Sequence, residues 1–373
     1  MLVTFENLIL SVAVFFVGAC MGSFFKLTAD RYGTSDSFVF KPSYCFHCKK
    51  KLLGWHNMPV ISYLILGGKC FFCKEKIDIN CFYSELVSGL LVLAVFISGV
   101  IKKQSNFDIG LTLLFVSFLI VLSIFDLKRR IIPHIITYSA IILFLIADFF
   151  SGRSVLSFFV SLGVAYIFMD LLYFFAVMIK KFEPEINLIS IPLIIWTTIF
   201  FYFHNIYIVL IPCLIYFIIM KFNVLLKSYK TLWIVFFIIL LFQIYKTGFL
   251  DFNLYNLGLL FAGFGIIYFV CEILLYFFGL FVDPPIHENQ NVSDSMNISI
   301  GGGDITVFAL ISVFLGFKLG FVVLFLASLL AIISHFIIRA ISFFKKITVS
   351  QAVPFVPYLS FACFIIIITS HGG

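Results

Sequence analysis

The sequence predicts an all-α polytopic membrane protein of about twelve transmembrane helices with a small cysteine-bearing loop. Of its 373 residues, 62% are hydrophobic and 12% are charged, with a mean hydropathy of +1.16. Soluble domains are about 45–50% apolar and about 25% charged. The lipid bilayer is therefore the expected environment of the chain. The net charge of +7 is modest and indicates membrane topology, so we expect no nucleic-acid partner.

Apolar runs of the length that crosses a bilayer, about 20 residues, recur along the whole chain. The first run, Leu8–Phe25, follows Glu6 and has no basic segment before it. We therefore expect a retained spanning helix and not a cleaved signal peptide. The runs predict spans near 6–26, 83–101, 108–127, 135–150, 155–179, 188–204, 206–220, 231–246, 254–281, 304–317, 320–339 and 352–369.

Polar stretches and charge divide the chain into parts and orient it. Cytoplasmic loops of membrane proteins are enriched in Lys and Arg. With the Lys-rich loop 28–82 in the cytoplasm, 20 of the 25 Lys and Arg residues fall inside. This orientation brings the ends of spans that carry Asp126 and Asp304 to the same cytoplasmic face. The expected parts are a first helix (1–27), the tetracysteine loop (28–82), helices with Asp126 (83–134), an extra transmembrane segment (135–253) and the final helices (254–373).

Two segments of the chain resemble each other weakly. Gly163–Tyr166 followed by Asp170 resembles Gly265–Tyr268 followed by Glu272. Further on, 187–191 resembles 297–300. Two interpretations stay open. Either about one hundred residues were duplicated and the first copy lost the acid found at Asp304, or the likeness arose by chance in helices rich in Phe and Leu.

Four cysteines in the loop form two Cys-x-x-Cys pairs, Cys45 with Cys48 and Cys70 with Cys73. Two such pairs supply the four thiolates that suit tetrahedral zinc. Four protein ligands close the coordination sphere, so we expect a structural zinc ion and not a catalytic one. A cytoplasmic position argues against disulfides. Reduced free cysteines and redox-active pairs remain alternatives.

Asp126 and Asp304 are the candidate catalytic pair. Acids at the edge of spans are costly and usually functional. Two carboxylates that share a site do not both ionise easily, so one can activate water while the other polarises a carbonyl. Gly301, Gly302 and Gly303 precede the second acid and let a backbone approach closely. The structural alternatives are a helix-end acid paired with Arg129 or Arg130, and a helix N-cap at Asp304.

Other embedded acids favour a structural interpretation. Asp170 and Glu272 occupy matching places in the suspected repeat, and we expect them to act in packing or hydrogen bonding. Asp148 is expected at the outer interface of the membrane.

A series of motifs lies along the chain, namely Gly18–Phe24 with Arg31, Cys45–Cys73 with Trp55, Asn57 and Pro59, then Tyr83–Leu86, Asp126 with Ile132–Pro133, Gly301–Asp304, and Val353–Leu359. In content and order the series resembles the type IV prepilin peptidases, a family of GxGD membrane aspartic proteases. Gly18–Phe24 with Arg31 resembles the opening motif of that family. Two departures concern the acids. They are 178 positions apart, further than is usual in the family, and Thr306–Val307 replaces the common Lys-Leu.

The resemblance implies an activity, a location and partners. It implies an aspartic endopeptidase in the bacterial inner (cytoplasmic) membrane that removes the basic leader of a prepilin or pseudopilin precursor at the cytoplasmic face. It also implies N-methylation of the new N-terminus with S-adenosylmethionine, for which the residues themselves give no independent sign. Two other classes stay open. One is an ion-coupled transporter that uses the embedded acids, and the other is a non-catalytic pilus-assembly protein.

Overall fold

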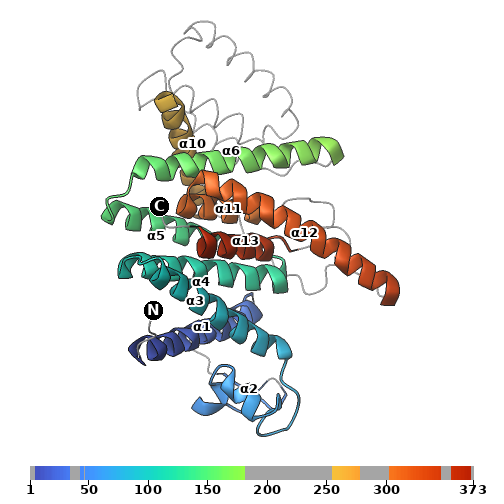
Figure 1. Ribbon diagram of the computed structural model, residues 1–373. Helices are drawn as coiled ribbons and strands as arrows, with labels where there is room; N and C mark the ends of the chain where they lie inside the picture. The colour runs from blue at the N-terminus through green and yellow to red at the C-terminus, as the bar shows by residue number, and fades with distance from the viewer. Residues whose placement is uncertain are drawn as a thin grey trace, which may run out of the picture. The chain divides into compact units, whose positions relative to one another are not determined.

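The computed structural model is all-helical in the residues that it describes, which are 5–33, 43–45, 47–180, 254–277, 302–345 and 354–370 (Figure 1). These residues divide into two compact units. The first unit holds α1 (Phe5–Arg31), η1 (Gly54–Asn57), α2 (Ile61–Ile65), α3 (Ile79–Ile101), α4 (Asn106–Arg129), α12 from Val323 onward, and α13 (Val356–Thr369). The second unit holds α5 (His134–Phe150), α6 (Val155–Lys180), α10 (Leu254–Phe277), α11 (Gly302–Leu315) and the first residues of α12 (Phe317–Lys345).

Glycines set the close packing of α1 against α3 in the first unit. A Cβ atom added to Gly18 would lie 2.8 Å from the Cβ of Val92 and 3.0 Å from the carbonyl oxygen of Ser88. One added to Gly22 would lie 2.6 Å from the hydroxyl of Ser88. Small residues let helix backbones approach closely in membranes. The Gly18–Gly22 motif therefore has a structural explanation as a helix contact.

The second unit contains both helices of the suspected repeat, and they pack against each other at equivalent positions. The rings of Tyr166 on α6 and Tyr268 on α10 stack with their centroids 4.2 Å apart. A Cβ atom on Gly265 would lie 2.7 Å from the backbone nitrogen of Gly163. Contact between equivalent positions is what a pseudo-twofold axis produces, which favours the duplication hypothesis. The later part of the repeat, 187–191 and 297–300, lies outside the described residues.

The described helices support a membrane protein, but they do not test the full number of predicted spans. Four of the described helices are long and apolar enough to cross a bilayer, namely Ile9–Arg31, Ile79–Ile101, Asn106–Arg129 and Phe317–Ser342. Shorter apolar helices occur near five of the other predicted spans. The predicted spans 188–204, 206–220 and 231–246, with most of the segment 135–253, lie outside the described residues. The total of twelve thus remains a prediction.

Candidate functional site

The four loop cysteines come together, as the sequence predicts. The sulfur atoms of Cys45, Cys48, Cys70 and Cys73 all lie within 4.8 Å of one another. Those of Cys45 and Cys73, one from each pair, are 3.9 Å apart. A tetrahedral zinc ion with bonds of about 2.3 Å to sulfur requires a separation of roughly 3.8 Å between sulfurs. The cluster therefore has the dimensions of a metal site.

The two cysteine pairs have the same backbone geometry. The amide of Cys45 donates to the carbonyl oxygen of Lys50, and that of Cys70 donates to Glu75. Lys49 and Lys74, each directly after the second cysteine of its pair, have positive φ angles of 57° and 60°. Their amides donate back to the carbonyl oxygens of Cys45 and Cys70. This shared geometry directs both sulfurs of each pair toward one point. Cysteines that lay close together by chance would have no reason to share it.

The thiols of the cluster differ in acidity. A hydrogen bond from the backbone amide of Cys73 is the main cause that lowers the pKa of Cys70 to about 7. The amide of Glu75 also favours the thiolate of Cys73, but desolvation and the neighbouring sulfurs outweigh it and raise its pKa to about 11. Neighbouring sulfurs resist carrying several negative charges together. A bound cation would remove that resistance, since thiolates are the metal-binding form.

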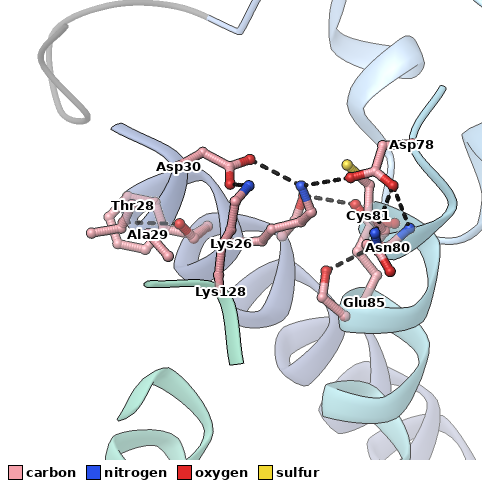
Figure 2. A network of polar contacts seen from close by, with 12 residues as sticks. Lys26, Thr28, Ala29, Asp30, Asp78, Asn80, Cys81, Glu85 and Lys128 are labelled. Carbon is pink, nitrogen blue, oxygen red and sulfur yellow. Dashed lines mark hydrogen bonds and ion pairs between the residues drawn. The ribbon is translucent and has the colours of Figure 1, made fainter. Parts of the chain in front are cut away.

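A cavity of about 880 Å³ lies between the loop and the neighbouring ends of α1, α3 and α4. Charged side chains cross-link these helices beside it (Figure 2). Lys26 of α1 contacts Asp30 at 2.9 Å and Asp78, just before α3, at 3.4 Å. Lys128 of α4 also pairs with Asp30. Arg129 donates to the carbonyl oxygens of Ala29, at 3.0 Å, and of Asp30, at 2.7 Å.

Glu85 of α3 also lines this cavity, and the sequence did not single it out as a site residue. Its carboxylate accepts hydrogen bonds from the Ser23 hydroxyl and from the Val60 backbone amide, both at 2.7 Å. Val60 has a φ of 64°, and the Ile61 amide bonds back to Pro59 at 2.6 Å. A β-branched residue with positive φ is strained. The sequence signal that could have identified Glu85 is the presence of an acid inside an apolar helix.

Asp126 lies near the end of α4 and is 7% exposed. Its carboxylate accepts a hydrogen bond from the Val356 amide at 3.0 Å. Val356 is the first residue of α13, so Asp126 binds the positive end of that helix. The Arg129 guanidinium bonds to the carbonyl oxygens of α1, so the structural alternative of an Asp126–Arg129 pair gains no support. The charge of Arg130 does act on the Asp126 carboxylate, so the alternative of an Asp126–Arg130 pair stays open.

Asp304 lies in the first turn of α11, which begins at Gly302. The acid is therefore inside the helix and not its N-cap, which corrects that structural alternative. The Thr306 hydroxyl donates to the carbonyl oxygen of Gly303 at 2.9 Å. Gly301 lies outside the described residues. Asp126 belongs to the first unit and Asp304 to the second, so their pairing stays a prediction.

Among the other embedded acids, Glu272 has the hydrogen-bonding role that we expected. Its carboxylate accepts a hydrogen bond from the Tyr138 hydroxyl at 2.8 Å. The side chain of Asp170 lies outside the described residues. Asp148 pairs with Arg153 at 3.2 Å, close to the turn between α5 and α6.

Comparison with known proteins connects the first unit to a peptidase family. Residues 16–98 match the bacterial peptidase A24 N-terminal domain. The proteins named prepilin leader peptidase/N-methyltransferase are similar to this chain. The one from Neisseria gonorrhoeae is 34% identical over 130 residues, which are 34% of this chain and 42% of the relative. The one from Stutzerimonas stutzeri is 32% identical over 112 residues, which are 30% of this chain and 37% of the relative.

The similarity is confined to part of each protein. A third relative of the same name, from Myxococcus xanthus, is 30% identical over 123 residues, or 33% of this chain and 36% of its own length. This chain thus spans well under half the length of the three relatives. No solved structure matches it. The matched region contains α1 from residue 16 onward, the cysteine cluster and Glu85.

Proposed function

We propose, from the membership of residues 16–98 in the bacterial peptidase A24 N-terminal domain family, that this chain is a membrane aspartic endopeptidase. Its substrates would be prepilin-like precursors, from which it removes a basic leader at the cytoplasmic face of the bacterial inner membrane. The observation that carries the proposal is the family match together with Asp126, a buried acid bound to the N-terminus of α13.

Asp126 and Asp304 would perform the hydrolysis as a pair. The ionised acid takes a proton from a water molecule, which attacks the scissile carbonyl carbon. The protonated acid donates its proton to the carbonyl oxygen, so that no full negative charge develops there. The tetrahedral intermediate then collapses, and the leaving amine takes a proton from the pair. The Val356 amide would hold Asp126 in one orientation throughout.

The polar cavity of the first unit supports a second activity, N-methylation of the new N-terminus. The donor that the relatives' name implies would be S-adenosylmethionine, a sulfonium compound with an aminocarboxylate and a purine. The residues present suit these parts. Asp78 offers a carboxylate to a cationic group, Tyr44 and Phe71 offer aromatic faces, and Arg129 offers a cation. When bound, the donor supplies an electrophilic methyl group to a neutral amine.

Zinc is the metal that we propose for the cysteine cluster. Four thiolates at tetrahedral spacing suit zinc, and they leave no open position for a substrate. The metal would hold the two cysteine pairs together and so fix the wall of the cavity to which Cys45 and Cys70 contribute.

One experiment tests both proposed activities. The full-length protein in nanodiscs is incubated with a prepilin-like precursor and S-adenosylmethionine, and the mass of the mature N-terminus is measured. We expect loss of the leader and a further gain of one methyl group. A known active relative, incubated with the same precursor, is the positive control. A precursor that the relative cleaves but that this protein leaves intact after prolonged incubation would contradict the proposal.

A further inference from the structure

Glu85 differs from two other acids that line the cavity in the kind of partner it has. Asp30 pairs with Lys26 and Lys128, and Asp78 pairs with Lys26. Both direct partners of Glu85 in the described part of the chain, the Ser23 hydroxyl and the Val60 amide, are uncharged. The positive charge of Lys26 also acts on Glu85, but the ion pairs of Lys26 are with Asp30 and Asp78. A half-buried carboxylate whose direct partners are uncharged is costly. A cationic group of a ligand would offset this cost.

The two donors also fix the direction of the remaining acceptor sites of Glu85. Ser23 bonds to one carboxylate oxygen and Val60 to the other, and an ionised carboxylate has about four lone-pair sites. One acceptor site therefore remains on each oxygen. An ammonium group can use either site, so Glu85 can accept an ammonium ligand without losing Ser23 or Val60.

Strain at Val60 indicates that this arrangement is maintained at a cost. Val60 is β-branched, has a φ of 64° and a ψ of −52°, and directs its amide at Glu85. Such residues persist where the surrounding structure forces them to, often at ligand-binding sites. The strain thus keeps one donor aimed at Glu85, so that the carboxylate is oriented before a ligand arrives.

A second unused polar group in the same cavity is His56, which is 6% exposed. The Leu53 amide donates to Nδ1 of His56, so the proton of the neutral ring lies on Nε2. Nε2 is buried and has no hydrogen-bond partner among the described residues. It is a donor available to an acceptor. The stacked rings of Tyr63 and Phe82 add an apolar wall.

These groups together match the start of a peptide chain, which presents an ammonium group, an apolar side chain and a carbonyl oxygen. Arg129 lines the cavity and follows Asp126 by three residues on α4, an axial rise of roughly 4.5 Å along the helix. Both groups thus belong to the same end of α4, so a peptide cleaved at Asp126 would have a short path for its new N-terminus to this cavity.

We propose that Glu85 binds the α-ammonium group of the mature N-terminus, with His56 donating to the first peptide carbonyl. The inference rests on the proposed function and assigns the acceptor end of its second reaction to named residues. Before methyl transfer the bound ammonium must give a proton to the Glu85 carboxylate, so that the nitrogen has a lone pair to accept the methyl group. Glu85 is thereby a substrate-binding residue of the cavity, and Ser23 and Val60 are its positioning groups.

The test measures binding to the full-length protein in nanodiscs, without turnover. The probe is a hexapeptide that begins with an apolar residue and carries a fluorophore at its C-terminus, with either a free or an acetylated α-amine. We expect wild type to bind the free amine about ten- to a hundredfold more tightly than the acetylated form, the range for a charge-assisted hydrogen bond. Glu85→Gln should lose this preference, and Glu85→Asp, which keeps the charge, should retain part of it.

Glu75→Gln is the matched control because Glu75 is an exposed acid on the same cavity, and it should keep the free-amine preference. Equal preference in wild type and Glu85→Gln would overturn the proposal. So would loss of S-adenosylmethionine binding in Glu85→Gln with peptide binding unchanged, since Glu85 would then bind the sulfonium. Because binding is measured without cleavage, these results decide the role of Glu85 independently of leader removal. Failure of the wild-type protein to remove a leader would contradict the proposed peptidase activity and not the role of Glu85.

Discussion

The carboxylate of Asp126 accepts a hydrogen bond from the backbone amide of Val356, 230 residues further along the chain and 3.0 Å away. The bond joins the end of α4 to the first residue of α13. The Val353–Leu359 motif thereby has a structural role, because it starts the helix whose amide binds that carboxylate. The nearby bond from Ser123 to Ser360, at 2.8 Å, fixes the same pair of helices.

The first prediction removes that amide. Val356→Pro deletes the donor at the first position of α13, where proline needs no amide partner. Phe355 must then leave its helical dihedrals (φ −92°, ψ −31°), because a following proline disfavours them. We expect leader cleavage to fall by about ten- to a hundredfold, the effect of losing a hydrogen bond to a charged group. Val356→Ala keeps the amide and loses only side-chain packing. Initial cleavage rates of folded protein are compared, and similar rates for the two variants would contradict an orienting role for the amide.

The second prediction concerns the acids themselves. Asp126→Asn and Asp304→Asn keep the shape of each side chain but remove its acid–base chemistry. Each should lower the rate of cleavage by roughly 10²- to 10⁴-fold, the contribution of a general acid or base. Asp148→Asn is the control, because Asp148 pairs with Arg153 near a helix end. Cleavage is measured by the mass shift of the precursor after confirming membrane insertion. Full activity in either catalytic variant would refute the pair.

The cysteine cluster could be predicted from the sequence, whereas the importance of Glu85 could not. Each Cys-x-x-Cys pair folds through contacts within a few residues, so its spacing already determines its geometry. Glu85 depends on Ser23, 62 residues before it, and on Val60, 25 residues before it. Single-sequence patterns carry little information on such distant contacts. Asp126 was found because an acid at the edge of a membrane span is costly, but its contact with Val356 was not predicted.

The suspected repeat is a second case in which the sequence alone could not predict a contact between distant residues. Sequence similarity alone could not decide between duplication and chance. The stacking of Tyr166 on Tyr268 adds what the sequence lacked, since chance similarity gives no reason for equivalent residues to meet.

The third prediction tests the metal. The purified protein should contain about one zinc ion per chain, measured by elemental mass spectrometry. Cys45→Ser and Cys73→Ser should lose it, because each removes one of four ligands. Cys81→Ser is the control, since Cys81 lies on α3 outside the four-sulfur group. Chelation should make the loop sensitive to protease, because metal binding contributes folding free energy. Zinc retained by the Cys45→Ser protein would count against the site.

The fourth prediction concerns the contact of α1 with α3. Gly22→Ala places a Cβ atom 2.6 Å from the Ser88 hydroxyl, and it should destabilise the protein by about 1–3 kcal/mol through overpacking. Gly110→Ala is the control, since an added Cβ there meets nothing within 4 Å. It should be neutral or stabilising by about 0.5–1 kcal/mol. Thermal unfolding in detergent measures both, and equal melting temperatures would show that the glycine contact is unimportant.

The fifth prediction separates the peptidase from the ion-coupled transporter, for which Glu272 is the best-defined embedded acid of the second unit. A carboxylate that accepts the Tyr138 hydroxyl at 2.8 Å is explained by its structural role. The Tyr268 hydroxyl also bonds to Glu272. Tyr138→Phe should therefore destabilise the protein by only about 0.5–1.5 kcal/mol, the net contribution of one hydrogen bond, and Glu272→Gln should leave ion flux unchanged. Proteoliposomes with an enclosed pH-sensitive dye should show the same proton leak for wild type, Glu272→Gln and empty vesicles. Flux in wild type that disappears in Glu272→Gln would favour the transporter, because a hydrogen-bonded structural acid has no reason to set a rate of ion movement.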